Sequence, residues 1–328
     1  MKILVTGGLG FIGSNFIIRI LKKYQDIKIT NIDAEFYGSN LENLSEIKNY
    51  SNYNFEKGNI NDSIIMEKLI KNNDIVINFA AESFVDRSIL DAKPFLQSNV
   101  EGVFTILELI KKYGKRLVHI STDEVYGSLK NDSAVEETRF NPSSPYSATK
   151  AAAELLVNSY VKTYDSDCVI TRCTNNYGPR QFAEKLIPKT IILAYFNKKI
   201  PIYGTGENIR DWLYVTDHCS AIEKVLFHGK KGESYNISAK NEINNLQIIE
   251  EILSIMNKPK NLMTFVEDRP GHDFRYSMDS LKIRNELKWT QTIEFKEGIK
   301  KTVEWYLNNK KWWEGISNQI LASTPWKN

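Results

Sequence analysis

Residues 7–13 read "GGLGFIG" and decide the fold, because a short apolar segment (2–6, "KILVT") precedes them and an apolar-periodic segment follows them to about residue 24. Gly8, Gly10 and Gly13 have the GxGxxG spacing, and Gly7 in place of Gly8 gives the related GxxGxxG spacing. Glycines at these places permit a tight turn and let a pyrophosphate approach the N-terminus of the following helix. A strand before the loop and a helix after it are the context that this motif requires. The segment therefore predicts a dinucleotide-binding unit. The predicted contacts are Gly7, Gly10, Phe11, Ile12 and Gly13.

An acidic residue marks the end of the second predicted strand, 28–32. Asp33 lies twenty residues after Gly13 and is followed by Ala34, with no arginine nearby. A carboxylate at this place accepts hydrogen bonds from ribose hydroxyls and repels a 2′-phosphate. The sequence thus favours NAD over NADP as the cofactor.

Strand-like and helix-like segments alternate through the first half of the chain. Further strands are predicted at 53–55, 75–79, 117–120 and 168–170, and helices at 61–71, 99–113 and 147–164. Such alternation is typical of an α/β fold with a doubly wound parallel sheet, the Rossmann fold. After "NNYGP" (175–179) the pattern becomes irregular. We expect an NAD-binding domain at 1–176, which also takes back about 209–230, and a smaller mixed α/β C-terminal domain at 177–328.

Composition excludes several classes of protein. The 328 residues are 42% hydrophobic and 25% charged, as in ordinary globular proteins, and the net charge of +3 is too small to indicate nucleic acid or a membrane surface as a partner. Three cysteines without CxxC spacing predict neither a disulfide framework nor a metal site. No signal peptide and no apolar stretch of about 20 residues is evident. We expect a cytoplasmic protein.

Two adjacent acids follow a predicted buried strand in "HISTDEVYG" (119–127). Neighbouring side chains in a strand point to opposite faces, so Thr122, Asp123 and Glu124 share one site only if the chain turns near Ser121. Ligands of open parallel sheets bind at this carboxyl end of the strands. The three residues are therefore candidates for catalysis.

The segment "YSATK" (146–150) places Tyr146 and Lys150 four residues apart on a predicted helix, hence on one face. A lysine charge, together with a positive nicotinamide ring, favours the phenolate and lowers the pKa of a tyrosine. Such a tyrosine can take a proton from an alcohol while hydride leaves the same carbon.

Together these motifs resemble the extended short-chain dehydrogenase/reductase family, and within it the dTDP-glucose 4,6-dehydratases. The similarity extends over the whole chain and includes "FAAESFVDRSI" (79–89), "STDEVYG" (121–127), "SPYSATKA" (144–151), "NNYGPRQFAEKLIP" (175–188), "RDWLYVTDH" (210–218), "DRPGHDFRY" (268–276) and "TVEWYLNNKKWW" (302–313). Seven blocks in the same order are a specific signal.

The resemblance implies a lyase that converts dTDP-glucose into dTDP-4-keto-6-deoxyglucose. C4 is oxidised, water is eliminated across C5–C6, and hydride returns to C6. Tyr146 is implied as the base for the 4-hydroxyl, with Thr122 and Lys150 beside it. Glu124 is implied as the base at C5 and protonated Asp123 as the acid for the 6-hydroxyl, which requires a raised pKa for Asp123.

Further contacts are implied by the resemblance alone. Those to NAD are Asn59, Ile60, Ala80, Ala81, Ser98, Tyr146, Lys150 and Asn176. Those to the nucleotide sugar, mainly from the C-terminal domain, are Ser83, Thr122, Asn175, Lys185, Leu186, Pro201, Tyr203, Arg210, Asn245, Asp268, Arg269 and His272. Phe84 and Phe274 stand where the family usually has a histidine and an arginine.

Two other readings share these motifs. A UDP-sugar 4-epimerase or a UDP-glucuronate decarboxylase has the same glycine loop and Tyr146/Lys150 pair, but neither needs a proton donor to a 6-hydroxyl. A non-catalytic NAD-binding regulator is a different class, and the intact acid–base set argues against it. The family also implies a homodimer through the helix at about 147–164, which carries small and apolar residues.

Overall fold

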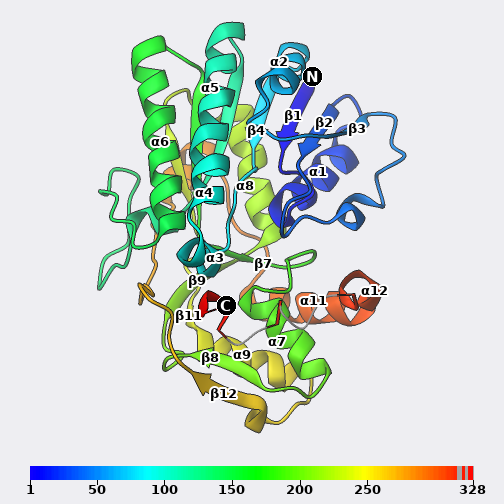
Figure 1. Ribbon diagram of the computed structural model, residues 1–328, viewed down its shortest axis with the longest axis vertical. Helices are drawn as coiled ribbons and strands as arrows, with labels where there is room; N and C mark the ends of the chain where they lie inside the picture. Colours follow the sequence, from blue (N-terminus) through cyan, green and yellow to red (C-terminus); the bar gives the residue numbers. More distant parts are fainter. Residues whose placement is uncertain (316–319, 322–323, 328) are drawn as a thin grey trace.

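The computed structural model describes residues 1–315, 320–321 and 324–327. Its upper lobe in Figure 1 contains a sheet of seven parallel strands in the order β10-β6-β5-β4-β1-β2-β3. The strands are β1 (Lys2–Thr6), β2 (Lys28–Asp33), β3 (Tyr53–Lys57), β4 (Ile75–Asn78), β5 (Arg116–Thr122), β6 (Cys168–Cys173) and β10 (Ser234–Ile237). β5 and β6 are buried almost throughout because helices cover both faces of the sheet.

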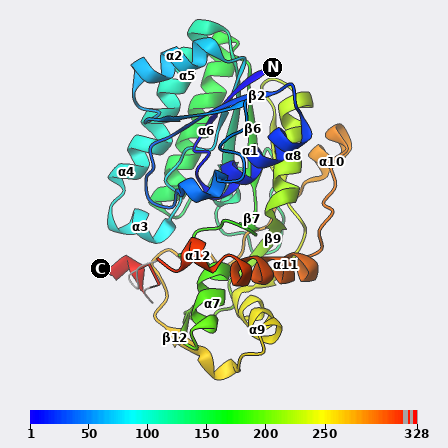
Figure 2. The ribbon, with the colours of Figure 1, turned by 90° about the vertical axis from the view of Figure 1, so that its right-hand side faces the viewer.

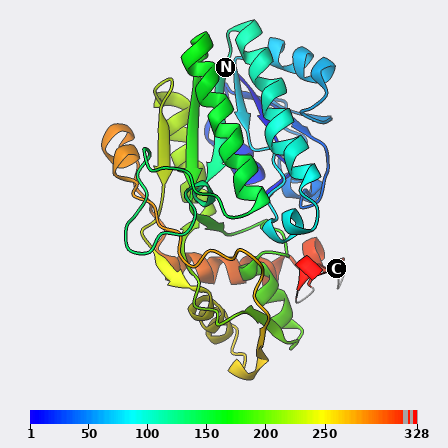
Figure 3. The ribbon, with the colours of Figure 1, turned by 60° about the vertical axis from the view of Figure 1, so that its left-hand side comes forward.

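Each face of this sheet has its own apolar core. On one side lie α1 (Phe11–Lys23), α8 (Val215–His228) and α10 (Leu281–Leu287). On the other side lie α2 (Ser63–Asn72), α5 (Gly102–Tyr113) and α6 (Pro145–Tyr164). Figure 3 shows α5 and α6 side by side on the outside of the lobe. The expected doubly wound α/β fold is therefore confirmed.

The site is positioned by the strand order. β1 lies between β4 and β2: the chain runs from β1 through β2 and β3 toward one edge of the sheet, then crosses to β4 and runs through β5 and β6 toward the other. A crevice opens at such a switch point, beyond the carboxyl ends of the strands. The short helices α3 (Val85–Leu90) and α4 (Lys93–Leu96) follow β4, and a π-helical turn, Gln97–Glu101, leads into α5.

The lower lobe is smaller and mixed (Figure 2). Its sheets are β11-β9-β7 and β12-β8, formed by β7 (Asn175–Tyr177), β8 (Ile200–Tyr203), β9 (Ile209–Tyr214), β11 (Glu242–Asn244) and β12 (Met263–Val266). Its helices are α7 (Leu186–Tyr195), α9 (Asn245–Ile255), α11 (Phe295–Asn308) and α12 (Lys310–Trp313). Single 3₁₀ turns occur at Leu41–Leu44, Asp123–Tyr126, Lys260–Leu262 and Pro325–Lys327.

The chain crosses between the lobes more than once. α8 and β10 belong to the upper lobe, although they follow β9 of the lower lobe in the chain. We expected only about 209–230 to rejoin the NAD-binding domain, and β10 lies beyond that segment. The exact division into domains stays a prediction.

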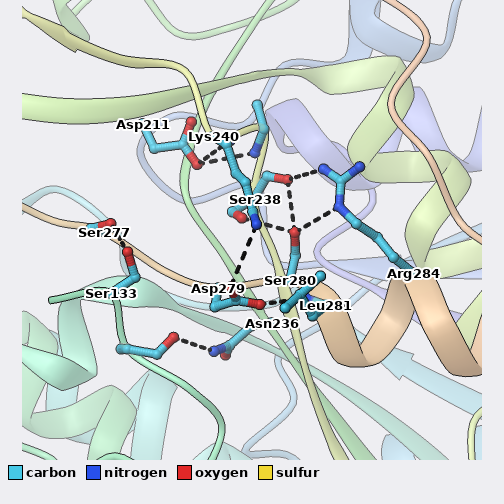
Figure 4. A network of polar contacts seen from close by, with 12 residues as sticks. Ser133, Asp211, Asn236, Ser238, Lys240, Ser277, Asp279, Ser280, Leu281 and Arg284 are labelled. Atoms are coloured by element: carbon cyan, nitrogen blue, oxygen red, sulfur yellow. Dashed lines mark hydrogen bonds and ion pairs between the residues drawn. The ribbon is translucent and has the colours of Figure 1, made fainter.

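A polar network fixes these crossings (Figure 4). The Asp211 carboxylate on β9 accepts hydrogen bonds from the backbone N–H groups of residues 239, 240 and 241 at 3.0, 3.2 and 2.7 Å. Ser238 donates to the Ser280 hydroxyl at 3.0 Å, and Arg284 donates to that hydroxyl and to the Ser238 carbonyl.

Within the described residues, no helix is both long and apolar enough to cross a membrane.

Candidate active site

The acid pair lies where β5 ends. The chain turns into a 3₁₀ helix directly after Thr122, whose hydroxyl caps the turn by accepting from the Glu124 N–H at 3.3 Å. This turn brings Thr122, Asp123 and Glu124 to the wall of a single cavity, although they are consecutive. Thr122 also donates to Asp123 Oδ1 at 3.2 Å, while Asp123 Oδ2 is buried without a hydrogen-bond partner.

The two carboxyls have different electrostatic surroundings. Burial raises the pKa of Asp123 well above its usual value, and the neighbouring Glu124 charge raises it further. Burial also raises the pKa of Glu124, but Arg269, Lys185 and Arg210 lower it. Asp123 is therefore the better proton donor of the pair and Glu124 the better base.

Tyr146 and Lys150 lie on the first turns of α6, beside the acids. Ser144 and Ser147 form a capping box, and Pro145 occupies the first turn, so the helix begins just before Tyr146. The Lys150 ammonium donates to the Ile120 carbonyl at 2.7 Å, and burial lowers the pKa of Lys150 to about 8.

We expected the pKa of Tyr146 to be lowered, and for the protein's own groups, without NAD, this prediction is wrong. Burial raises the pKa of Tyr146 well above its usual value, the Glu124 charge raises it further, and a hydrogen bond with Thr122 opposes the rise. Spacing on a helix predicts which side chains are neighbours, but it does not reveal how deeply they are buried.

The first cavity has a volume of about 290 Å³ and begins at the glycine loop. Gly7 has φ +71°, and a Cβ there would lie 2.6 Å from the Ala80 nitrogen; a Cβ on Gly13 would lie 2.6 Å from the Gly7 carbonyl oxygen. The loop can therefore pack closely only without side chains. The Asp33 carboxylate at the other side accepts from the N–H groups of Leu9 and Glu35 at 2.9 and 2.8 Å.

Every predicted cofactor contact lines this cavity. They are Gly7, Gly10, Phe11, Ile12, Gly13, Asp33, Asn59, Ile60, Ala80, Ala81, Ser98, Tyr146, Lys150 and Asn176. Six lining residues hold a buried polar atom without a partner, namely Ser121, Asp123, Thr174, Asn175, Asn176 and Gln181. Buried polar atoms are normally hydrogen-bonded, so this wall fits a large polar ligand such as a dinucleotide.

A second cavity, of about 170 Å³, joins the first at Phe84, Glu124, Asn175 and Lys185. Its lining includes Lys185, Leu186, Pro201, Tyr203, Arg210, Asn245, Arg269 and His272 among the predicted substrate contacts. Ser83 and Thr122 line the first cavity instead. Four cationic side chains, Lys185, Lys189, Arg210 and Arg269, line this space together with the acids Asp86, Glu124 and Glu184. Lysine and arginine are the side chains that pair with a diphosphate.

Asp268 differs from the other predicted contacts because it lines neither cavity. Its Oδ1 contacts His272 Nδ1 at 2.6 Å and accepts from the Arg269 N–H at 2.8 Å. Asp268 therefore holds two lining residues in place.

Several lining residues were not predicted. Asp86 forms an ion pair with Arg269 at 3.0 Å, and Tyr276 lies 4.3 Å from the Arg210 guanidinium, which is over its ring. Both belong to sequence blocks that carry the family resemblance, "FAAESFVDRSI" and "DRPGHDFRY". Glu184 lines the second cavity and belongs to the block "NNYGPRQFAEKLIP", whereas Tyr37 lines the first cavity and lies in no such block.

Residues 4–302 match the model of the family described as GDP-mannose 4,6 dehydratase. The chain belongs to this family. A dTDP-glucose 4,6-dehydratase of Escherichia coli is 43% identical, and the match covers 98% of each chain. The expected membership of the dehydratases is thereby confirmed.

Solved structures agree in fold. The dTDP-glucose 4,6-dehydratase of Bacillus anthracis in complex with NAD has a TM-score of 0.91 and 46% identity, covering 97% of this chain and 100% of that chain. A UDP-glucose 4-epimerase of Thermus thermophilus in complex with NAD has a TM-score of 0.87 but only 26% identity, covering 94% and 100%. The fold is common to dehydratases and epimerases, whereas sequence identity is higher with the dehydratase.

Proposed function

We propose that the protein is a lyase that catalyses the NAD-dependent dehydration of dTDP-glucose to dTDP-4-keto-6-deoxyglucose. The observation that carries this proposal is the pair Asp123 and Glu124, two adjacent carboxyls that line the first cavity, Glu124 lining the second as well. Burial raises the pKa of both, and that of Asp123 more strongly. Elimination of water needs an acid and a base at the same time. The names of the 43% and 46% identical relatives support the same substrate.

NAD fits the first cavity, where the glycine loop, Asp33 and the unpartnered polar atoms would hold it. When bound, it supplies a reversible hydride acceptor, and its positive ring favours the phenolate that burial disfavours in Tyr146. Asp33 is suited to the ribose hydroxyls, so NAD is favoured over its phosphorylated form.

The remaining steps are proton transfers by the chain's own residues. Tyr146 takes the proton of the sugar 4-hydroxyl, the Lys150 charge favours the phenolate, and Thr122 hydrogen-bonds the phenol. A ketone at C4 acidifies the proton at C5, which Glu124 removes and would give back to C5 when C6 accepts the returning hydride. Asp123, kept protonated by burial and by Glu124, gives its proton to the departing 6-hydroxyl.

The second cavity would hold the nucleotide diphosphate. Arg210 is buried and the Arg269 side chain is 16% exposed. The Arg210 guanidinium is held by the carbonyls of Ile209, Asp273 and Phe274 at 2.8 to 3.1 Å. Guanidinium groups fixed in this way pair well with phosphate oxygens. The predicted contacts Asn175, Tyr203, Asn245 and His272 complete this site, and Ser83 would reach the substrate from the first cavity.

Purified protein incubated separately with dTDP-, UDP-, GDP- and CDP-glucose tests the proposal, with absorbance of the 4-keto product as the readout. We expect product with dTDP-glucose above all, and none from Tyr146→Phe. Epimerised sugar without a 4-keto product would instead favour the epimerase reading, and absence of any turnover would favour a regulator.

We also propose that the protein is a cytoplasmic homodimer. The outer face of α6 carries Ala148, Ala152 and Leu155 in helical spacing, and Leu155 is 61% exposed. Phe104 on the neighbouring α5 is 49% exposed. Small and apolar residues on two adjacent helices suit a two-fold helix interface. The three buried cysteines are unpaired, which suits a reducing compartment.

A further inference from the structure

Tyr37 links the loop after β2 to the opposite lobe. The loop covers the adenosine side of the first cavity, which residues 36–39 line. It is anchored at both ends: Asp33 accepts a hydrogen bond from the Glu35 N–H, and the Asn40 N–H donates one to the Leu9 carbonyl. Between these anchors the Tyr37 hydroxyl donates to Glu184, which precedes α7 in the lower lobe. A side chain from the cofactor-side loop therefore closes onto the substrate-side lobe.

Arg87 on α3 completes this contact. Its Nε and Nη2 atoms each lie 3.3 Å from Glu184 Oε2, and its guanidinium lies 3.4 Å from the centre of the Tyr37 ring. The Glu184 side chain is only 5% exposed, so water hardly reaches the carboxylate, whereas the Arg87 side chain is 40% exposed and its charge is partly screened. Three separate segments thus converge on one carboxylate.

An aromatic cluster fills the space beneath. The Tyr37 ring packs edge-on against Phe84 and Phe182, with ring centres 5.0 and 4.9 Å apart, and Phe84 and Phe182 contact each other. Phe182 and Tyr37 line the first cavity, and Phe84 lines both cavities. Gly38 has φ +90°, and a Cβ there would meet the Phe84 ring at 2.8 Å, so the loop lies tightly against the cluster.

We propose that Tyr37, Glu184 and Arg87 form a latch that retains NAD in the cavity between turnovers. The residues of the latch join the two rims of the cavity, 36–39 on one side and 181–185 on the other. Separation of these rims, and hence release of a ligand as large as a dinucleotide, requires that Tyr37 leave Glu184. This inference rests on the proposed function, because a hydride that must return to the same substrate requires that the cofactor stay bound.

The variant Tyr37→Phe tests the latch because it removes one oxygen and leaves the aromatic packing intact. Protein loaded with radiolabelled NAD is chased with excess unlabelled NAD, without sugar nucleotide, and the dissociation rate of the label is measured. Loss of one hydrogen bond to a charged group predicts dissociation roughly tenfold to a hundredfold faster.

Tyr24→Phe is the matched control. The Tyr24 hydroxyl donates to Glu223 at 2.7 Å, and Arg19 pairs with that same carboxylate at 2.6 Å, but these residues lie between α1 and α8 and line neither cavity. Its NAD dissociation rate should equal that of the wild type. Glu184→Gln, which keeps an acceptor for Tyr37 but removes the charge that Arg87 pairs with, should accelerate dissociation as well.

The latch would be overturned if NAD dissociated from Tyr37→Phe less than fivefold faster than from the wild type. It would also be overturned if Tyr24→Phe accelerated NAD dissociation as much as Tyr37→Phe does. If the wild type retains NAD and Tyr37→Phe releases it at the wild-type rate, the latch is refuted but the proposed function is not. Wild-type protein that binds no NAD at all overturns the proposed function and the latch with it.

Discussion

A buried ion pair behind the active site allows a worked stability prediction. Arg172 on β6 and Glu154 on α6 have side chains that are 3% and 0% exposed. Arg172 donates to the Glu154 carboxylate at 2.7, 2.9 and 3.1 Å, and also to the Tyr126 hydroxyl at 2.6 Å. The pair thus joins the helix that carries Tyr146 to the turn that carries Asp123 and Glu124.

Arg172→Met leaves the Glu154 carboxylate buried without its partner. Removal of one member of a buried ion pair costs about 3–5 kcal/mol, whereas replacement of both by apolar residues is close to neutral. With a slope of about 3 kcal/mol per molar, the urea midpoint should fall by about 1–1.7 M. The double variant Arg172→Met/Glu154→Leu should recover most of this loss.

Urea unfolding followed by circular dichroism, at one fixed NAD concentration, measures these midpoints. Lys112→Met is a control, since it breaks the ion pair with Glu67 on the exposed surface and should leave the midpoint unchanged. A midpoint for Arg172→Met within about 0.3 M of the wild type, less than a third of the smallest expected shift, would refute this account of the ion pair. It fails equally if the double variant is no more stable than the single one.

Three further predictions concern the cofactor, the pH profile and assembly. Gly13→Val should abolish NAD retention, measured as nucleotide released on denaturation, because a Cβ would lie 2.6 Å from a backbone oxygen; full retention would contradict this. Lys150 is protonated below its lowered pKa of about 8 and neutral above it, so kcat/KM should fall as pH rises through about 8, and a flat profile up to pH 10 would refute the role of its charge. Leu155→Glu should shift the mass in light scattering from twice 37.8 kDa to 37.8 kDa, unless the dimer forms elsewhere.

Local sequence patterns predicted the parts of the site that lie on single elements. The glycine loop, Asp33 and the Tyr146/Lys150 spacing each depend on residues that are close in the chain, so the geometry of one turn or one helix is enough to interpret them. The turn after Thr122 could be expected from the chemistry of two adjacent acids. The doubly wound parallel sheet could be predicted from the alternation of strands and helices, whereas the order of its strands could not.

Contacts between distant segments could not be predicted in this way. Tyr37 and Glu184 are 147 residues apart, and Arg269 and Asp86 are 183 apart, so only the folded chain brings them together. The four-residue strand β10 has no distinctive pattern, and its place beside β6 depends on tertiary packing. The pKa of Tyr146 depends on burial, which the spacing of a tyrosine and a lysine does not reveal.

The central claim is that Glu124 removes the C5 proton and Asp123 protonates the 6-hydroxyl. Exchange of the C5 hydrogen of dTDP-glucose in deuterated water, measured by mass spectrometry for Glu124→Gln and Asp123→Asn, tests it most directly. We predict that exchange is lost in Glu124→Gln. In Asp123→Asn it should persist, while water loss slows by about 10²–10⁴-fold, as is typical of a lost general acid. Exchange in Glu124→Gln at the wild-type rate would contradict the assignment and make Asp123 the candidate base.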